Sequence, residues 1–120
     1  MRLGLFALVS LFVVSSVRGD SVAGQLVGHW QYSEKGLTAD YVIKGDNTFT
    51  GHLYHQGKAA WHCTGKWTLS GKTINTVLTR SSAEQIPAGT KDRKVLVEVT
   101  KDYCRLQNQD GSIWKYVRAP

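Results

Sequence analysis

Four histidines are the side chains in this sequence best suited to metal binding or proton transfer: His29, His52, His55 and His62. His52 and His62 fall on neighbouring segments of alternating polarity, on the polar side of each. Two imidazoles on adjacent strands could bind a transition metal, but a site also needs a third ligand and partners that orient the rings. The sequence identifies no third ligand, so we expect neither a metal nor another cofactor.

The nine acidic residues offer no pair suited to acid–base catalysis. Four of them lie in turn-like surroundings, where hydrogen bonds to the backbone explain an aspartate: Asp46, Asp92, Asp102 and Asp110. Glu98 lies within an alternating segment and is expected to face water. The chain also lacks nucleophile motifs, phosphate-binding glycine loops and zinc-finger spacing. The pattern favours a protein that is not an enzyme.

The two cysteines, Cys63 and Cys104, both follow an apolar amino-terminal segment. In an exported chain an even cysteine count favours a disulfide, which for a loop of this length would contribute on the order of 3–4 kcal/mol. We therefore predict one Cys63–Cys104 disulfide. A reactive or metal-binding cysteine pair is the alternative.

Aromatic residues give the stronger indication of a binding site. The chain holds Trp30, Trp61, Trp67, Trp114, Tyr41, Tyr54 and Tyr116. Such side chains line small-molecule pockets, although they also fill protein cores. We expect Trp30 and Trp67 in the core and Trp61 at the mouth of a pocket. The predicted ligand-binding residues are Tyr41, Leu53, Trp61 and Ile86; Ile86 lies in a long segment that is either a lid or a mobile surface loop.

The amino-terminal residues predict export. Met1-Arg2 precedes an apolar run that ends near Val17, too short to span a bilayer comfortably and followed by small residues. We interpret residues 1–19 as a signal peptide, with a membrane anchor as the alternative, and residues 20–120 as one domain that is secreted or periplasmic. Without Arg2 and Arg18, thirteen basic residues stand against nine acidic ones, a net charge of +4 with no coherent basic stripe. We therefore expect no nucleic-acid partner.

Eight short segments rich in β-branched and aromatic residues follow one another along the domain: Leu26–Ser33, Ala39–Lys44, Thr48–His55, Trp61–Leu69, Thr73–Thr79, Lys94–Thr100, Tyr103–Asn108 and Ser112–Arg118. No stretch shows convincing helical periodicity. In the fourth segment Trp61, Cys63, Gly65, Trp67 and Leu69 share one side, opposed by polar residues. In the sixth, Val95, Val97 and Val99 share one side and Leu96, Glu98 and Thr100 the other.

Short turns such as Gly45-Asp46-Asn47 and Asp110-Gly111 join these segments into an antiparallel meander. Closing the sheet removes its two exposed edges, and the inward glycines Gly51 and Gly65 suit the bends that closure needs. The predicted fold is all-β, an eight-stranded up-and-down antiparallel barrel with one disulfide. A flat sheet or a sandwich is the alternative.

Three motifs give this chain a family resemblance: Leu26-Val27-Gly28-His29-Trp30, then Gly45-Asp46-Asn47-Thr48-Phe49, then Gly65-Lys66-Trp67-Thr68-Leu69. In this order they resemble small bacterial lipocalin-like domains of the calycin type. The resemblance implies that Arg118 packs over Trp30. An avidin-like barrel is also similar, at Gly28-His29-Trp30 and at Phe49-Thr50-Gly51-His52-Leu53-Tyr54, but the polar set for biotin has no match. The predicted domain departs from the family pattern in being shorter than a full lipocalin, and we expect no helix after the last predicted strand.

The fold resemblance implies a non-catalytic monomeric barrel that binds a small apolar or amphipathic molecule. One alternative is a secreted protease inhibitor that inserts its amino-terminal segment, residues 20–25, into a protease cleft. The other is a filled barrel that acts through its surface. After removal of the leader we expect no stable membrane insertion.

Overall fold

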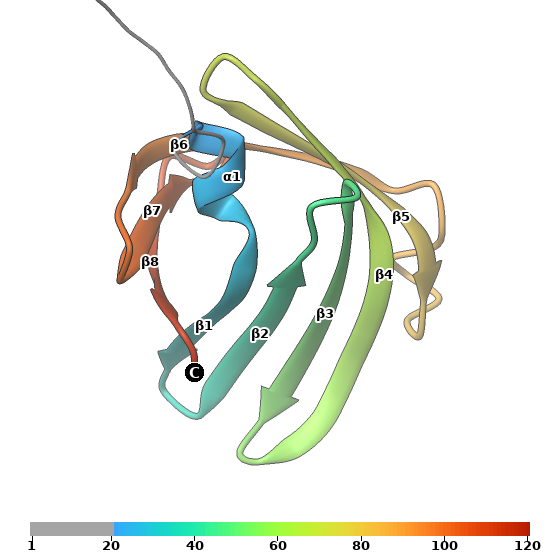
Figure 1. Cartoon of the computed structure of the whole chain (residues 1–120). Coiled ribbons are helices and arrows are strands. Elements are labelled where there is room, and N and C mark those ends of the chain that lie inside the picture. Colours follow the sequence, from blue (N-terminus) through green and yellow to red (C-terminus); the bar gives the residue numbers. More distant parts are fainter. Residues whose placement is uncertain (1–20) are drawn as a thin grey trace, which may run out of the picture.

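The computed structural model describes residues 21–120, which form one short helix and eight strands (Figure 1). The predicted signal peptide lies outside the described residues. The elements are α1 (Val22–Leu26), β1 (Gly28–Glu34), β2 (Leu37–Ile43), β3 (Thr48–His55), β4 (Lys58–Ser70), β5 (Thr73–Ser81), β6 (Lys91–Val99), β7 (Tyr103–Gln107) and β8 (Ile113–Arg118). Each of the eight predicted segments corresponds to one strand.

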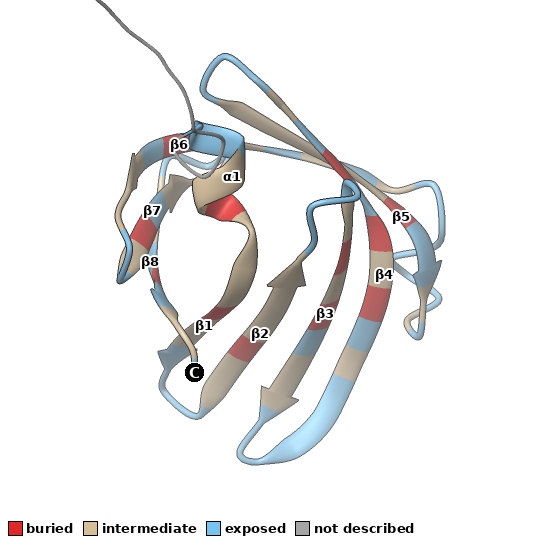
Figure 2. Ribbon diagram, viewed as in Figure 1, coloured by how far each residue is buried: buried red, intermediate tan, exposed pale blue. Residues whose placement is uncertain are grey.

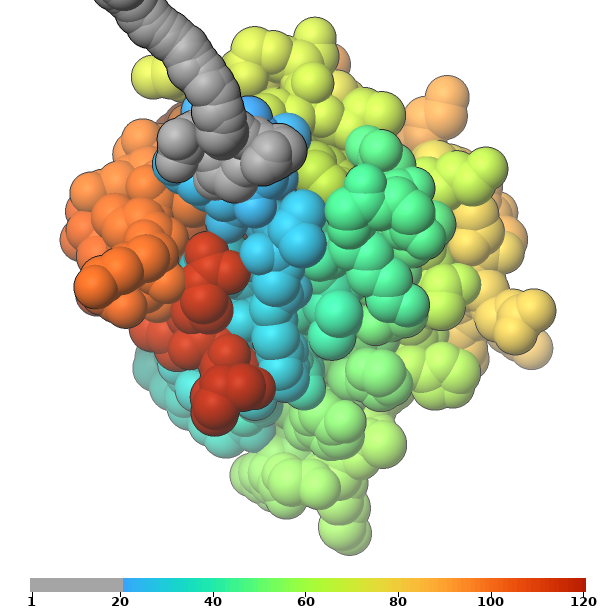
Figure 3. All heavy atoms as spheres, in the orientation of Figure 1, coloured from blue at the N-terminus to red at the C-terminus, as the bar shows by residue number. Residues whose placement is uncertain are grey.

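The strands form a closed barrel in which every strand pairs antiparallel with its neighbours in sequence. The closing pair joins β1 to β8, with Trp30 opposite Arg118 and Gln31 opposite Val117. In Figure 3 the blue beginning of β1 accordingly lies beside the red carboxy-terminal residues. The predicted up-and-down barrel is confirmed, and the alternative of a flat sheet or a sandwich is wrong.

Because the strands run alternately up and down, their connections divide between two ends of the barrel. One end, here the helix end, holds α1 and the turns at residues 44–47, 71–72 and 100–102. The other, here the loop end, holds the turns at residues 35–36, 56–57 and 108–112 and the longest connection, residues 82–90. The helix end therefore carries α1 and short turns, whereas the loop end carries the longest connection.

Helix α1 was not expected from the sequence. The side chain of Ser21 caps it by accepting a hydrogen bond from the Gly24 N–H at 2.9 Å, and Leu26 at its last position is 5% exposed. A helix of five residues is too short for a periodic pattern to develop. The one local indication of this helix in the sequence was Ser21, because serine is a preferred N-cap residue.

The predicted alternation of faces holds in β4 and fails in β6. In β4, Cys63, Gly65 and Trp67 are buried, whereas the residues that alternate with them are exposed or, at Thr64, half-buried. Figure 2 shows separate red bands along this strand. In β6, however, Leu96 is buried while Val95 and Val97 are 41% and 44% exposed. A bulge between Leu96 and Glu98 changes the register, so that Val99 packs against the core again.

Two inward glycines let other side chains approach the strands closely. A Cβ atom at Gly51 would lie 2.7 Å from Cε1 of Tyr41 and 3.1 Å from Sγ of Cys63. At Gly65 it would collide with the backbone oxygen of Val77 and the ring of Phe49. The strands bend and pack as the barrel requires because these positions carry no side chain.

Candidate functional site: the interior of the barrel

The barrel encloses a cavity of about 340 Å³. Its wall is mainly aromatic and aliphatic and includes Phe49, Trp67, Leu78 and Leu106, all of which pack in or against the core. Small-molecule pockets in proteins usually have volumes of roughly 300–1,000 Å³ and walls of this composition. The cavity is therefore large enough for a small apolar body.

At the helix end the cavity wall includes Trp30, and Arg118 packs over the Trp30 ring. Trp30 is 3% exposed, and its indole Nε1 donates a hydrogen bond to the backbone oxygen of Leu26 at 2.8 Å. The Arg118 guanidinium carbon lies 4.1 Å from the centre of the Trp30 ring, in the contact that the resemblance implied. The guanidinium also donates to three backbone oxygens, those of Lys101 at 2.7 Å, Gln25 at 2.9 Å and Val27 at 3.0 Å. One side chain thus joins α1, the start of β1 and the β6–β7 turn.

At the loop end the cavity reaches the surface. Ile86 lines it while 37% exposed, and Lys91 at the start of β6 lines it while exposed. The connection folds back on β5: the Gly89 N–H donates to the Leu78 oxygen at 2.7 Å, and the Leu78 N–H donates to the Thr90 oxygen at 2.9 Å. The long connection is therefore attached to the barrel wall near its end, while Ile86 lies at the opening.

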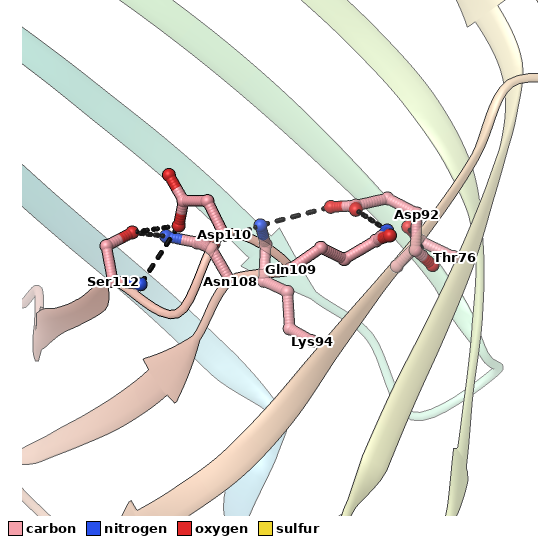
Figure 4. A network of polar contacts seen from close by, with 7 residues as sticks. All are labelled: Thr76, Asp92, Lys94, Asn108, Gln109, Asp110 and Ser112. Atoms are coloured by element: carbon pink, nitrogen blue, oxygen red, sulfur yellow. Dashed lines mark hydrogen bonds and ion pairs between the residues drawn. The ribbon is translucent and has the colours of Figure 1, made fainter.

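A polar network lies on the loop end beside this opening (Figure 4). Lys94 Nζ donates to Asn108 Oδ1 at 2.7 Å and lies 3.0 Å from Asp92 Oδ2. The other oxygen of Asp92 accepts a hydrogen bond from Gln109 Nε2 at 3.1 Å. Burial raises the pKa of Asp92, but the hydrogen bond and charge of Lys94 outweigh burial, so the pKa lies below its ordinary value. Asp92 is therefore an anion at neutral pH.

Two tyrosines, Tyr41 from β2 and Tyr116 from β8, line the middle of the cavity with ring centres 6.0 Å apart. Burial raises the pKa of Tyr41 to about 12 and raises the pKa of Tyr116 as well. Both hydroxyls therefore remain protonated at neutral pH. No hydrogen bond joins either hydroxyl to another group among residues 21–120, so both can bond a molecule in the cavity.

Cys63 and Cys104 also line the cavity, and both are free thiols in the structure. They lie on β4 and β7, which are not neighbours in the barrel, and so the predicted disulfide is not formed there. Burial raises the pKa of Cys104 to about 12 and that of Cys63 above its ordinary value, which makes both poor nucleophiles. Intact mass after alkylation without reductant tests whether the isolated protein carries the bridge.

Three of the four predicted ligand-binding residues line the cavity: Tyr41, Trp61 and Ile86. The indole Nε1 of Trp61 donates to Ser81 Oγ at 2.8 Å, which fixes the ring. Leu53 is not among the lining residues, although Trp61, its partner in the pairing of β3 with β4, is one of them. With no ligand present, the binding role of all four stays a prediction.

Sequence reasoning assigned no binding role to Tyr116, Asp92 or Lys94. Tyr116 could have been found, since it alternates with Trp114 and Arg118 in the last strand. Asp92 was interpreted as a turn residue because the sixth strand was predicted to begin only at Lys94. The structure starts β6 at Lys91 and pairs Asp92 with Thr76, which places the Asp92 side chain on the inner face.

None of the four histidines lines the cavity, and His52 and His62 lie on the outer face. His52 and His62 are directly opposite on β3 and β4 with ring centres 6.1 Å apart, as the alternation predicted. Asp40 is opposite His52 on the other side and contacts the His29 ring. Within residues 21–120, no group of three or more histidine, cysteine or acidic side chains is placed to hold a metal ion.

No protein-family model and no curated protein matches this chain. Among solved structures, the barrel is similar to a lipocalin-like protein from Bacteroides uniformis, with 17% sequence identity and a TM-score of 0.48. The match covers 80% of this chain and 100% of that one. In the part of the chain that the structure describes, no helix has the length and apolar character needed to cross a membrane.

Proposed function

We propose that this protein is a secreted, non-catalytic barrel that binds a small apolar or amphipathic molecule in its interior. The observation that carries the proposal is the cavity of about 340 Å³, apolar along most of its wall and reaching the surface beside Ile86. The raised pKa values of the tyrosines and cysteines inside also fit a binding role, because groups that stay protonated are poorly suited to nucleophilic chemistry. The barrel acts as a monomer and has no nucleic-acid partner.

The protease-inhibitor alternative gains no support from the amino-terminal segment. That reading needs residues 20–25 to extend into a cleft on another protein. Instead, residues Val22–Leu26 are helical, and the oxygen of Gln25 accepts a hydrogen bond from Arg118. Leu26 is buried against the core. Extending the segment would break these contacts.

Titration with the neutral dye N-phenyl-1-naphthylamine tests the proposal. The cavity is lined by three indoles, those of Trp30, Trp61 and Trp67, so a dye bound inside will quench tryptophan emission by energy transfer. We expect saturable binding of one dye per barrel, and displacement of the dye by dodecanol. If the folded wild-type protein shows no saturable binding, the proposal is wrong.

A matched pair of substitutions locates the dye. Thr76 lines the cavity, whereas Thr68, on the adjacent strand, is exposed on the outer face. Thr76→Phe puts a ring into the cavity and should weaken dye binding about tenfold or more, since bulk in a preformed pocket excludes the ligand. Thr68→Phe makes the same change outside and should leave binding unchanged. Equal effects of both substitutions would place the dye on the surface instead.

A further inference from the structure

Lys94 presents an unused donor to the cavity. An ammonium group carries three N–H donors, and two of those on Lys94 are directed at Asn108 Oδ1 and Asp92 Oδ2. Because Lys94 lines the cavity, its third donor is available to a molecule inside. Asp92 differs in that each of its oxygens already has a partner, Lys94 on one and Gln109 on the other.

The charges that line the cavity have a net positive sign and lie together. They belong to Lys91, Asp92 and Lys94, all within the first four residues of β6. The remaining wall is neutral, and the hydroxyls of Tyr41, which is half-buried, and Tyr116, which is buried, can also donate. A ligand with an acceptor group at this end would therefore find donors and a favourable charge, whereas a cationic ligand would face two ammonium groups.

Away from β6 the cavity is suited to an apolar body. The wall continues through Trp67 and Leu78 to Leu26 and Trp30, each of which is at most 8% exposed. The Arg118 charge at that end is used by Trp30 and three backbone oxygens. Polar interactions are thus available at one end and hydrophobic burial at the other.

We propose that the ligand is an amphipathic carboxylate, whose acid group accepts a hydrogen bond from Lys94 Nζ while its apolar body occupies the cavity towards Trp30. This inference rests on the proposed function and specifies its ligand class. It also gives Asp92 a role: the carboxylate of Asp92 holds Lys94 in place, while its negative charge repels the acid group of the ligand.

The first test compares three ligands with one apolar chain, dodecanoate, dodecanol and dodecylamine, by displacement of N-phenyl-1-naphthylamine at neutral pH. A hydrogen bond to a charged group in a partly buried site is worth about a tenfold change in affinity. We therefore expect dodecanoate to bind about tenfold more tightly than dodecanol, and dodecylamine to bind most weakly. Equal affinities for the acid and the alcohol would overturn the inference.

Substitutions then identify the group responsible. Lys94→Met keeps an apolar stem and removes the charge, so the acid should lose its advantage over the alcohol. Lys58→Met removes the same charge from an exposed residue at the start of β4, outside the cavity wall, and should preserve that advantage. If both substitutions reduce the advantage equally, the effect comes from overall charge and the inference is wrong.

Asp92→Asn should increase the affinity for dodecanoate, whereas a substitution that only damaged the site would decrease it. Removing the negative charge that repels the ligand's acid should increase dodecanoate affinity a few-fold and leave dodecanol affinity unchanged. A loss of dodecanoate affinity in this variant, with thermal unfolding unchanged, would contradict the proposed repulsion. The two proposals can fail separately: if dye and dodecanol bind but dodecanoate gains nothing, only the carboxylate is excluded, whereas no binding of any probe excludes the cavity function itself.

Discussion

The two ends of this barrel are built from different kinds of interaction. At the helix end, Trp30 and Arg118 satisfy backbone groups from α1 and the β6–β7 turn while they pack against each other. At the loop end, Asp92, Lys94 and Asn108 satisfy one another through side chains that remain partly exposed. The first arrangement holds segments of backbone together, whereas the second can add a hydrogen bond to a ligand without unfolding any strand.

This difference separates stability from binding along the barrel. Substitutions at the helix end should lower the free energy of unfolding, because they release backbone carbonyl groups and buried aromatic surface. Substitutions at the loop end should change affinity with little effect on folding. The predictions below test that separation.

Trp30→Ala should produce the largest loss of stability. Truncation of a buried tryptophan costs roughly 3–5 kcal/mol, and Trp30 is 3% exposed. Trp114 on β8 is only half-buried, stacked on Tyr32 at a ring-centre distance of 4.4 Å, and serves as the matched control. Urea unfolding should show a clearly smaller loss for Trp114→Ala. Equal losses would mean that the barrel depends on both ends alike.

Alkaline pH should destabilise the wall between the two ends. Burial raises the pKa of Tyr41 from 10.0 to about 12, so above pH 10 this residue loses its proton in the unfolded chain before it does so in the folded one. Its contribution to stability is therefore complete below pH 10 and is lost between pH 10 and 12, by up to about 3 kcal/mol. Tyr41→Phe should show a shallower decline of unfolding free energy in that window. An unchanged slope would show that Tyr41 ionises normally and is not buried.

Arg118→Met should cost about 2 kcal/mol, since the substitution removes charged hydrogen bonds to three carbonyl groups and the contact with Trp30. Arg105 provides the comparison. Its ion pair with Glu98 at 3.1 Å is formed by side chains 45% and 38% exposed, so Arg105→Met should cost at most about 1 kcal/mol. Chemical unfolding of both variants measures the difference, which must favour Arg118 if this side chain holds the helix end together.

Sequence reasoning succeeded where local pattern and long-range structure agree. The strands and the barrel followed from turn residues and alternation, and the Trp30–Arg118 contact followed from a family resemblance. β6 was different, because a bulge reverses its alternation and its inner face begins with Asp92 and Lys94. In the sequence, charged residues at such positions resemble a loop. The partners that satisfy them, Asn108 and Gln109 in the β7–β8 turn, are far away along the chain.

The candidate site could be predicted only in part for a related reason. Aromatic content indicated a pocket, and Tyr41, Trp61 and Ile86 do line one. Which inward residue meets the cavity, however, depends on the stagger between strands: Leu53 and Trp61 are paired on β3 and β4, yet Trp61 lines the cavity and Leu53 does not. Stagger is set by pairing across the whole barrel, which no single segment encodes.

Ile86 should affect ligand exchange while leaving stability nearly unchanged. It lies at the opening, 37% exposed, on a connection whose hydrogen bonds to β5 come from Gly89 and Thr90 instead. Ile86→Ala should therefore change the free energy of unfolding by less than about 0.5 kcal/mol. Because the variant covers the bound molecule less completely, dissociation of N-phenyl-1-naphthylamine measured by stopped flow should become a few-fold faster.

Val117→Ala is the matched control for Ile86, since Val117 is 47% exposed on the outer face of β8. It should leave the dissociation rate unchanged. A large loss of stability in Ile86→Ala would mean that the loop end is held together by buried apolar contacts, as the helix end is. A dissociation rate unaffected by Ile86→Ala would mean that the ligand leaves by another path, and the opening would then have to be sought elsewhere along β5 and β6.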